Sequence, residues 1–271
     1  MSRGGQEQLE RPITVSDLVS DLAALGVAPG DILLVHSALR AVSGERSMVL
    51  GGPVAIVEAL QRALGPDGTL VMPAFSADYS EPASWVNPPA PEAWWPMVRE
   101  HWPAFRPDRT PTHRIGIVPE TFRAMRDVLR SDHPQSSFCA WGANASELLR
   151  GHRPETGLGD DSPLGTLHRM DGRALLIGCG WGSNTCFHLA EYRMRRPPQR
   201  VRQGAPMIEH GPRHWIEWED LDIDTSDFEA LGEAFEQSGK VRVGRVGRAT
   251  ARLFSVRSAV DFARRWLDRH R

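Results

Sequence analysis

The sequence predicts an α/β fold with a mixed, largely parallel central sheet flanked by helices. Short apolar runs at residues 31–36 and 68–73 are typical of buried strands, and residues 53–64 between them have the pattern of a helix. A strand, a helix and a second strand in this order indicate a crossover between parallel strands. The apolar run at 173–180 predicts a further buried strand.

The same rules predict the other elements. A helix is expected over 14–26, because its leucines share one face and Gly26 can end it. Further helices are expected at 119–129, 144–149, 162–170, 186–194 and 226–239, and after Ser255. Further strands are expected at 136–142, 213–224, 241–247 and 251–256.

Residues 76–112 break this pattern, because they are rich in proline and tryptophan and show little periodicity. A long stretch without regular structure is often a lid or a binding loop. Alternatively, Trp85, Trp94, Trp95 and Trp102 only fasten an insertion to the core. Since no repeat or linker divides the chain, we expect one domain over 1–271 with a loop insertion at 76–112.

Composition excludes several classes of protein. With 32 Lys+Arg, 34 Asp+Glu and a net charge of −2, the chain lacks the basic excess of a dedicated nucleic-acid binder. It has no apolar run near the roughly 20 residues that span a membrane. The start of the sequence has no apolar signal region, and Cys139, Cys179 and Cys186 are too few for a disulfide framework. We therefore expect a cytoplasmic protein.

The loop after the first strand is the first candidate site. Open α/β sheets bind ligands at the carboxyl ends of strands, where His36 and Ser37 lie. Gly51 and Gly52 precede the next helix, whose N-terminus favours a phosphate, and Arg40 can add charge. The loop matches neither a Walker A nor a G-x-G-x-x-G motif, so a plain connection also explains it.

His188 and Glu191 form the second candidate. Their i, i+3 spacing places both side chains on one helix face. A neutral imidazole can take a proton from an amine or a hydroxyl, and a carboxylate can fix its tautomer. A purely structural His–Glu pair is the alternative. Metal binding is less favoured, because the His-Glu-x-x-His pattern of zinc peptidases is absent from the sequence.

The third candidate is acidic. Residues 217–229 contain seven carboxylates, which favours a cationic ligand, with loop carboxylates such as Asp78 and Asp161 joining them. A solvated strand edge followed by a helix start explains the same stretch without a ligand.

Several motifs in order along nearly the whole chain resemble the aminoglycoside 3-N-acetyltransferase family. The motifs are LLVHSALRAV (33–42), GGPVAIVEAL (51–60), ALGPDGTLVMPAFS (63–76), SDHPQSSFCAWG (131–142), GLGDDSPLG (157–165), LLIGCGWGSNT (175–185) and HLAEYR (188–193). The resemblance implies the antibiotic N-acetyltransferase fold, which is distinct from the GNAT superfamily. It also implies transfer of acetyl from acetyl-CoA to the 3-amino group of 2-deoxystreptamine antibiotics, and thereby antibiotic resistance.

The resemblance also implies roles for individual residues. His188 would be the general base, with Glu219 as its partner carboxylate. The residues along acetyl-CoA would be His36, Ser37, Arg40, Gly51, Gly52, Ser76 and His133. Aminoglycoside contacts would be Asp78, Asp161, Glu191 and Asp222. The family implies acetyl-CoA as co-substrate and no metal, and a homodimer is compatible with it.

Rival interpretations stay open. The same fold can acetylate another amine, and departures from the family at Trp181–Ser183, Cys186 and Arg114 bear on which amine is accepted. A metal-dependent hydrolase using His188 and Glu191 is a second rival, and a non-catalytic aminoglycoside binder is a third.

Overall fold

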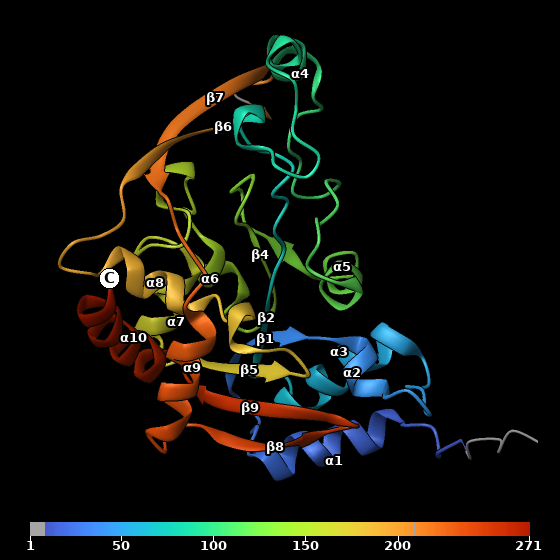
Figure 1. Cartoon of the computed structure of the whole chain (residues 1–271). Helices are drawn as coiled ribbons and strands as arrows, with labels where there is room; N and C mark the ends of the chain where they lie inside the picture. The colour runs from blue at the N-terminus through green and yellow to red at the C-terminus, as the bar shows by residue number, and fades with distance from the viewer. Residues whose placement is uncertain (1–8, 209) are drawn as a thin grey trace, which may run out of the picture.

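The central sheet organises the molecule (Figure 1). The computed structural model describes residues 9–208 and 210–271, and over these residues the sheet has seven strands in the order β3-β4-β2-β1-β5-β9-β8. The strands are β1 (Ile32–Ser37), β2 (Thr69–Pro73), β3 (Leu129–Arg130), β4 (Phe138–Gly142), β5 (Arg173–Ile177), β8 (Arg242–Val246) and β9 (Ala249–Ser255).

The sheet is mixed, as expected. β1 is parallel to both β2 and β5, whereas the outer strands all pair antiparallel. The α/β class and the mixed sheet flanked by helices are confirmed, but the parallel part is confined to the three central strands. The reason is local, since β3–β4 and β8–β9 are joined by connections too short for a parallel crossover.

Helices cover both faces of the sheet. Successive strand side chains point to opposite faces, so Leu33 and Val35 belong to one apolar cluster and Leu34 to the other. The first face is covered by α1 (Val15–Leu25), α2 (Leu39–Ser43), α3 (Gly52–Leu64) and α5 (Ile117–Arg123). The second face is covered by α6 (Ala145–Leu149), α7 (Pro163–Arg169), α8 (Cys186–Tyr192), α9 (Phe228–Gln237) and α10 (Val256–His270).

A two-stranded ribbon extends beyond this core (Figure 1). It consists of β6 (Arg200–Ile208) and β7 (Arg213–Leu221), which pair antiparallel along their whole length. The alternating pattern at 213–224 predicted β7. β6 was not predicted, because Gly204 and Pro206 are atypical of a strand.

The segment 76–112 packs on this ribbon. It contains η1 (Pro82–Ser84), η2 (Glu92–Trp94) and α4 (Trp95–His101), so the expectation of a stretch without regular structure is wrong. Tyr79 and Phe105 form a third apolar cluster with Trp218 of β7, and Trp102 packs against it. This contact supports the interpretation that tryptophan side chains fasten the segment 76–112 to the rest of the protein. The lid role and the single-domain division stay predictions. No helix within residues 9–208 and 210–271 is long and apolar enough to span a membrane.

Candidate active site

The carboxyl ends of β1 and β5 open into a first cavity of about 310 Å³. His36 and Ser37 line it from the end of β1, and Thr185 and His188 line it from the start of α8. The turn between β5 and α8 contains η4 (Trp181–Ser183). The carboxyl end of the first strand, where the sequence predicts that a ligand binds, therefore lines a cavity.

A second cavity of about 410 Å³ lies next to it. Its walls include Gln135, Ser136 and Asp224. Three residues line both cavities: Phe75, His188 and Thr225. The imidazole of His188 is thus placed where the two hollows meet.

His188 is paired with Glu191 on α8. The distance from His188 Nδ1 to Glu191 Oε2 is 2.6 Å, with 7% of His188 and 0% of Glu191 exposed. A carboxylate accepts hydrogen bonds, so Nδ1 carries a proton, and in the neutral imidazole Nε2 then has a free electron pair. The i, i+3 spacing in the sequence predicted this pair, and the arrangement suits a general base.

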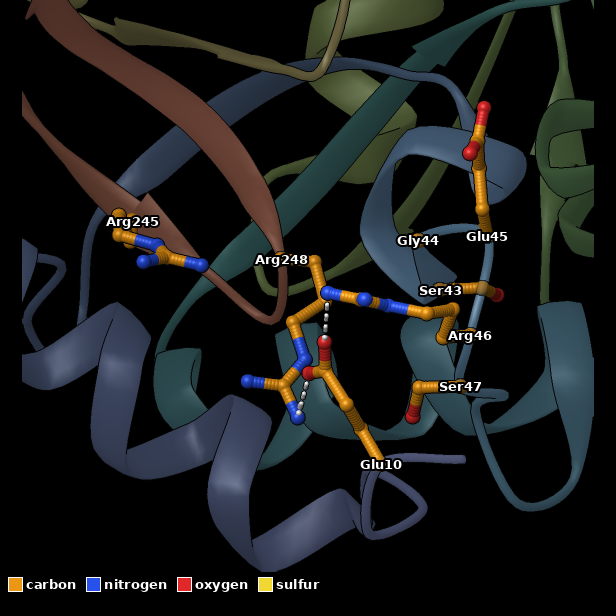
Figure 2. A pocket seen from close by; sticks show the side chains of 8 residues that line it. All are labelled: Glu10, Ser43, Gly44, Glu45, Arg46, Ser47, Arg245 and Arg248. Carbon is orange, nitrogen blue, oxygen red and sulfur yellow. Dashed lines mark hydrogen bonds and ion pairs between the residues drawn. The ribbon is translucent and has the colours of Figure 1, made fainter. Parts of the chain in front are cut away.

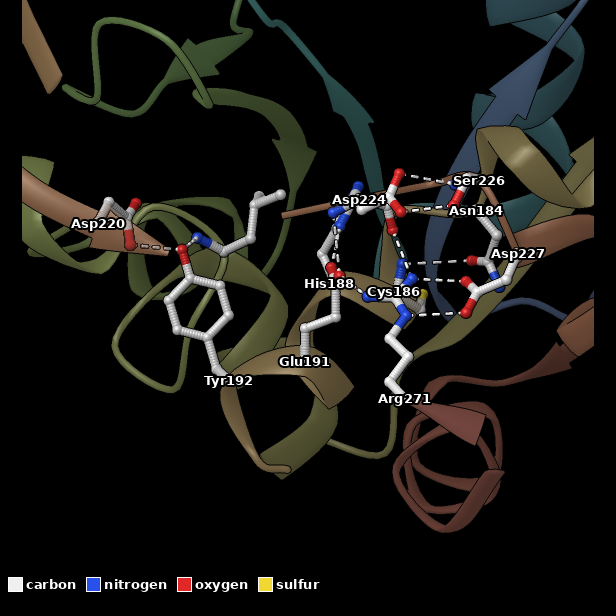
Figure 3. A network of polar contacts seen from close by, with 11 residues as sticks. Asn184, Cys186, His188, Glu191, Tyr192, Asp220, Asp224, Ser226, Asp227 and Arg271 are labelled. Atoms are coloured by element: carbon white, nitrogen blue, oxygen red, sulfur yellow. Dashed lines mark hydrogen bonds and ion pairs between the residues drawn. The ribbon is translucent and has the colours of Figure 1, made fainter. Parts of the chain in front are cut away.

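The second oxygen of Glu191 is also bonded (Figure 3). Glu191 Oε1 accepts from the guanidinium of Arg271 at 2.5 Å and from the backbone N–H of Asp224 at 3.0 Å. Arg271 in turn reaches both carboxylate oxygens of Asp227, at 2.5 and 2.8 Å. Hydrogen bonds to these carboxylates raise the pKa of Arg271, so it stays charged. No local sequence pattern pointed to Arg271.

Glu219 does not take the partner position implied by the resemblance. Its side chain is exposed on β7, where Trp218 and Asp220 alternate with it and are buried. Strand alternation turns Glu219 toward solvent, while Glu191 is the carboxylate bonded to His188. Glu191, implied as an aminoglycoside contact, has both oxygens occupied inside the protein.

His36 and Ser37 differ in their polar contacts. His36 Nε2 lies 3.2 Å from Thr185 Oγ1, and burial together with the nearby His188 lowers the pKa of His36 to about 4. His36 is therefore neutral at pH 7. The buried Ser37 Oγ has no hydrogen-bond partner among the described residues. A buried polar atom without a partner is costly, which makes Ser37 a candidate ligand contact.

The other residues of the first loop lie apart from His188. Arg40 is exposed on α2, and Gly51, with φ 89°, caps α3 directly before Gly52. None of the three lines either cavity at His188. Beside this loop is a cavity of about 510 Å³ whose lining includes Arg46, Arg245 and Arg248.

Figure 2 shows this arginine cavity from close by. Glu10 bridges two of its cations, with 3.2 Å to Arg46 and 2.7 Å to Arg248. With three arginines and the carboxylates of Glu10 and Glu45, the lining has an excess of positive charge. Such a lining suits an anionic group.

Ser76 and His133 are buried and satisfied within the protein. Ser76 Oγ donates to the carbonyl of Pro134 at 2.9 Å. His133 Nδ1 accepts the N–H groups of Gln135 and Ser136 at 3.1 and 2.9 Å, and burial holds the pKa of His133 well below its usual value. His133 therefore shapes the turn whose residues line the second cavity, without lining a cavity at His188 itself.

The predicted acidic contacts are dispersed. Asp161 and Asp222 are exposed outside both cavities, and Asp78 follows Ala77 of the second cavity, with its Oδ1 3.8 Å from His113 Nδ1. Of the seven carboxylates at 217–229, five bond to groups of the protein: Glu217, Asp220, Asp224, Asp227 and Glu229.

Asp224 is the member of this acidic stretch that lines the second cavity. Hydrogen bonds from Ser226 lower the pKa of its carboxyl, so it is ionised at pH 7. The sequence placed Asp224 in the acidic stretch without singling it out. Within residues 9–208 and 210–271, no three His, Cys, Asp or Glu side chains are grouped as metal ligands.

Comparison with known proteins gives consistent matches. Residues 34–268 match the family model described as aminoglycoside 3-N-acetyltransferase. The chain is 44% identical over 257 residues to the SPbeta prophage-derived aminoglycoside N(3')-acetyltransferase-like protein YokD of Bacillus subtilis (strain 168), covering 94% of this chain and 92% of that protein. It is 34% identical to aminoglycoside N(3)-acetyltransferase VIII of Streptomyces fradiae, covering 97% and 96%.

Solved structures agree with these matches. The crystal structure of YokD from Bacillus subtilis superposes with a TM-score of 0.92 at 43% identity, covering 96% of this chain and 94% of that chain. AAC-IIIb, solved with CoASH, gives 0.85 at 31% identity, covering 96% and 98%. AAC-VIa, solved with sisomicin, gives 0.84 at 30% identity, again covering 96% and 98%.

Proposed function

Because the chain belongs to the aminoglycoside 3-N-acetyltransferase family, we propose that it transfers an acetyl group from acetyl-CoA to the 3-amino group of a 2-deoxystreptamine aminoglycoside. One observation carries this proposal. His188, paired with the buried Glu191, lines two adjoining cavities. In a direct transfer one base can serve both substrates, and the position of His188 supports this role.

In the proposed reaction, the neutral 3-amino group attacks the thioester carbonyl while His188 Nε2 takes its proton. The C–N bond forms in this attack and gives the tetrahedral intermediate. The C–S bond breaks when the intermediate collapses. The proton held by His188 then passes to the leaving thiolate, which departs as free CoA. Glu191 keeps the imidazole in the Nδ1–H tautomer and stabilises the transient imidazolium.

We assign acetyl-CoA to the first cavity. The free hydroxyl of Ser37 gives the thioester end a hydrogen-bonding group. The phosphates of acetyl-CoA would extend to the α2–α3 loop. There Arg40 and Arg46 supply positive charge, and Gly51 and Gly52 at the start of α3 supply backbone N–H groups. The relative AAC-IIIb has been solved with CoASH, which supports a CoA site in this fold.

We assign the aminoglycoside to the second cavity. Asp224 offers an ionised carboxylate there, and an aminoglycoside carries several ammonium groups. The relative AAC-VIa has been solved with sisomicin. Replacing Asp224 by Asn should raise KM for the antibiotic by roughly 3- to 10-fold, with a smaller effect on KM for acetyl-CoA.

The test is release of free thiol from acetyl-CoA with a panel of aminoglycosides, including members that lack a free 3-amino group. Release that requires the 3-amino group supports the proposal, and mass spectrometry with fragmentation locates the acetyl group. His188→Gln should lower kcat by about 10²–10⁴-fold while the protein stays folded. A folded His188→Gln variant with wild-type turnover would falsify the general-base role.

A different amine is the second candidate substrate. It is favoured by the fact that Glu217 and Asp227 of the acidic stretch are paired with Arg202 and Arg271, which leaves less net negative charge for a polycation. In the same assay, release with other amines but with no aminoglycoside would select this candidate.

We propose antibiotic resistance as the biological role and the cytoplasm as the location. Acetyl-CoA is the co-substrate, and the cysteines Cys139, Cys179 and Cys186 are free thiols, which suits a reducing compartment. A homodimer stays a prediction.

A further inference from the structure

The carboxylate of Glu191 bonds both to the titratable ring of His188 and to the guanidinium of Arg271. Its Oε2 accepts from His188 Nδ1, and its Oε1 accepts from the guanidinium of Arg271, so one carboxylate links the imidazole to a permanent cation (Figure 3). Glu191 is 0% exposed, so its charge has no compensation from bulk water. A buried carboxylate without a cation would favour the protonated form of the neighbouring imidazole.

Arg271 is held in place by four hydrogen bonds. It follows α10, whose apolar residues Val260, Ala263 and Leu267 belong to the same core cluster as α8. Its guanidinium bonds to Glu191, to both oxygens of Asp227 and, at 2.8 Å, to the carbonyl of Asp224. The side chain is only 19% exposed. A planar guanidinium suits several fixed acceptors at once.

These contacts join the base to the cavity wall. Asp224 and Thr225 line the second cavity, and Thr225 also lines the first. By holding the carbonyl of Asp224 and the carboxylate of Asp227, Arg271 fixes the backbone of this wall on either side of Thr225.

Resting on the function proposed above, we propose that Arg271 is a positioning residue: it fixes Glu191 and the 224–227 loop, and it keeps His188 in the neutral form that can accept a proton. Arg271 touches neither substrate in this proposal. It acts through Glu191, and the sign of its effect follows from its charge. Removing the cation leaves an uncompensated carboxylate beside the imidazole. The carboxylate then favours the protonated imidazole, which cannot act as a base.

Other charged or titratable groups near His188 come from several elements. Glu191 bonds to His188 directly. The other charged or titratable residues that line a cavity together with His188 are His36, Arg114, Cys179 and Asp224. His36 is neutral at pH 7, because burial lowers its pKa to about 4. Asp224 adds negative charge in the second cavity, and Arg114 adds positive charge in the first. The Arg271→Met substitution keeps the charge of each of these groups, and Arg271→Lys, which keeps the cation, separates the loss of charge from a movement of the 224–227 loop.

The experiment compares Arg271→Met with Arg271→Lys and with Arg269→Ala. Met keeps most of the apolar length and removes the charge, whereas Lys restores charge without the bidentate geometry. Arg269 is an exposed arginine two positions away, whose guanidinium bonds only to the Arg265 carbonyl among the hydrogen bonds of the described residues. Kinetics are measured with acetyl-CoA and an accepted aminoglycoside from about pH 5 to about pH 9.

For Arg271→Met we expect kcat at pH 7 to fall about 10-fold or more, and the acid limb of the kcat profile to move up by about one pH unit. Activity should recover partly at higher pH. Arg271→Lys should keep the wild-type acid limb and regain part of kcat, and Arg269→Ala should match the wild type. A folded Arg271→Met protein with an unmoved acid limb overturns the proposal, whatever its kcat.

Two measurements keep the outcome interpretable. If Arg271→Met fails to fold in a thermal unfolding control, Arg271→Gln is used, because it also removes the cation and should move the acid limb in the same direction. If the wild type acetylates no aminoglycoside, the ¹⁵N spectrum of histidine-labelled protein still reports the His188 ring, assigned with His188→Gln. A tautomer and titration unchanged by Arg271→Met would then overturn the inference independently of the proposed function.

Discussion

His188 Nδ1 lies 2.6 Å from Glu191 Oε2, one helical turn apart on α8, and both side chains are buried. This bond fixes which ring nitrogen carries the proton, and it leaves Nε2 as the atom able to accept one. The ring lines two cavities, and in the proposed reaction this single nitrogen serves a nucleophile in one cavity and a thioester in the other. The pair is local in sequence, but its surroundings are assembled from distant parts of the chain.

The first prediction concerns the carboxylate partner. Replacing Glu191 by Gln keeps the size of the side chain and removes the charge that would stabilise an imidazolium in the proposed reaction. We expect kcat to fall by about 10²-fold or more, with a small change in KM for either substrate. Steady-state kinetics with acetyl-CoA and an accepted aminoglycoside measure both quantities.

Glu219→Gln is the matched comparison, because Glu219 is the carboxylate implied by the family resemblance yet is exposed on β7. It should keep kcat within about twofold of the wild type, since exposed charges contribute little. Equal losses in the two variants, or a larger loss at Glu219, would mean that this structure assigns the wrong carboxylate to His188.

The second prediction concerns the arginine cavity beside the α2–α3 loop. Arg46 and Arg248 converge there on the carboxylate of Glu10. If the phosphates of CoA lie along this loop, Arg46→Ala should raise KM for acetyl-CoA by roughly 3- to 10-fold and leave kcat unchanged. Added salt should reduce the difference between variant and wild type.

Arg126→Ala is the control for this effect, because Arg126 is a 95% exposed arginine whose ion pair is with the adjacent Asp127. It should leave both constants unchanged. An Arg46→Ala protein with wild-type KM for acetyl-CoA at low salt would remove Arg46 from the CoA path.

The third prediction concerns packing under the active-site turn. A methyl group added at Gly232 of α9 would lie 1.9 Å from Cγ of Trp181, a buried residue of η4. Alanine usually stabilises a helix relative to glycine, but here the overlap should dominate and cost about 1–3 kcal/mol of unfolding free energy. Urea unfolding measures this change.

The neighbouring Glu233→Ala substitution on the exposed face of α9 reports helix propensity without the overlap. It should change the free energy of unfolding by less than about 0.5 kcal/mol. A Gly232→Ala protein as stable as the wild type would show that Trp181 can move, which would put the rigidity of the turn before α8 in question.

The sequence predicts the local parts of this site and not the distant ones. The His188–Glu191 pair follows from helix periodicity, and the position of His36 follows from the end of a buried strand. Arg271 bonds to Glu191 across 80 positions, and no local pattern states where the end of α10 will lie relative to α8. The bond between His36 and Thr185 spans 149 positions, and no local sequence pattern predicts it either.

The acidic stretch shows a second limit of sequence reasoning. A high density of carboxylates predicts negative potential, but it does not state how many of them pair within the fold. Asp227 is neutralised by Arg271, and Glu229 accepts backbone N–H groups of Trp181 and Gly182. Tertiary partners therefore decide which carboxylates remain for a ligand, and Asp224 is the member that lines a cavity at His188.

The fourth prediction is a loss of stability on mild acidification. Burial lowers the pKa of His36 and of His152 to about 4, and it lowers the pKa of His133 as well. The ordinary value is about 6.5, so between about pH 6.5 and pH 4 the unfolded chain binds protons that the folded chain excludes. Stability is therefore full above this window and falls as pH decreases, by about 1.4 kcal/mol per pH unit for each fully titrating histidine.

One buried carboxyl opposes this trend, because burial raises the pKa of Asp220. The three histidines named above act against it, as does His168, whose pKa burial also lowers, so the net slope should keep the stated sign. Urea unfolding at about pH 7 and about pH 5 measures the slope for the wild type and for His152→Gln, which should show a shallower one. His101→Gln replaces an exposed histidine and is the control for a His→Gln change itself. Equal free energies of unfolding at the two pH values in the wild type would mean that these imidazoles are protonated inside the fold, and that the neutral state assigned to His36 beside the base is wrong.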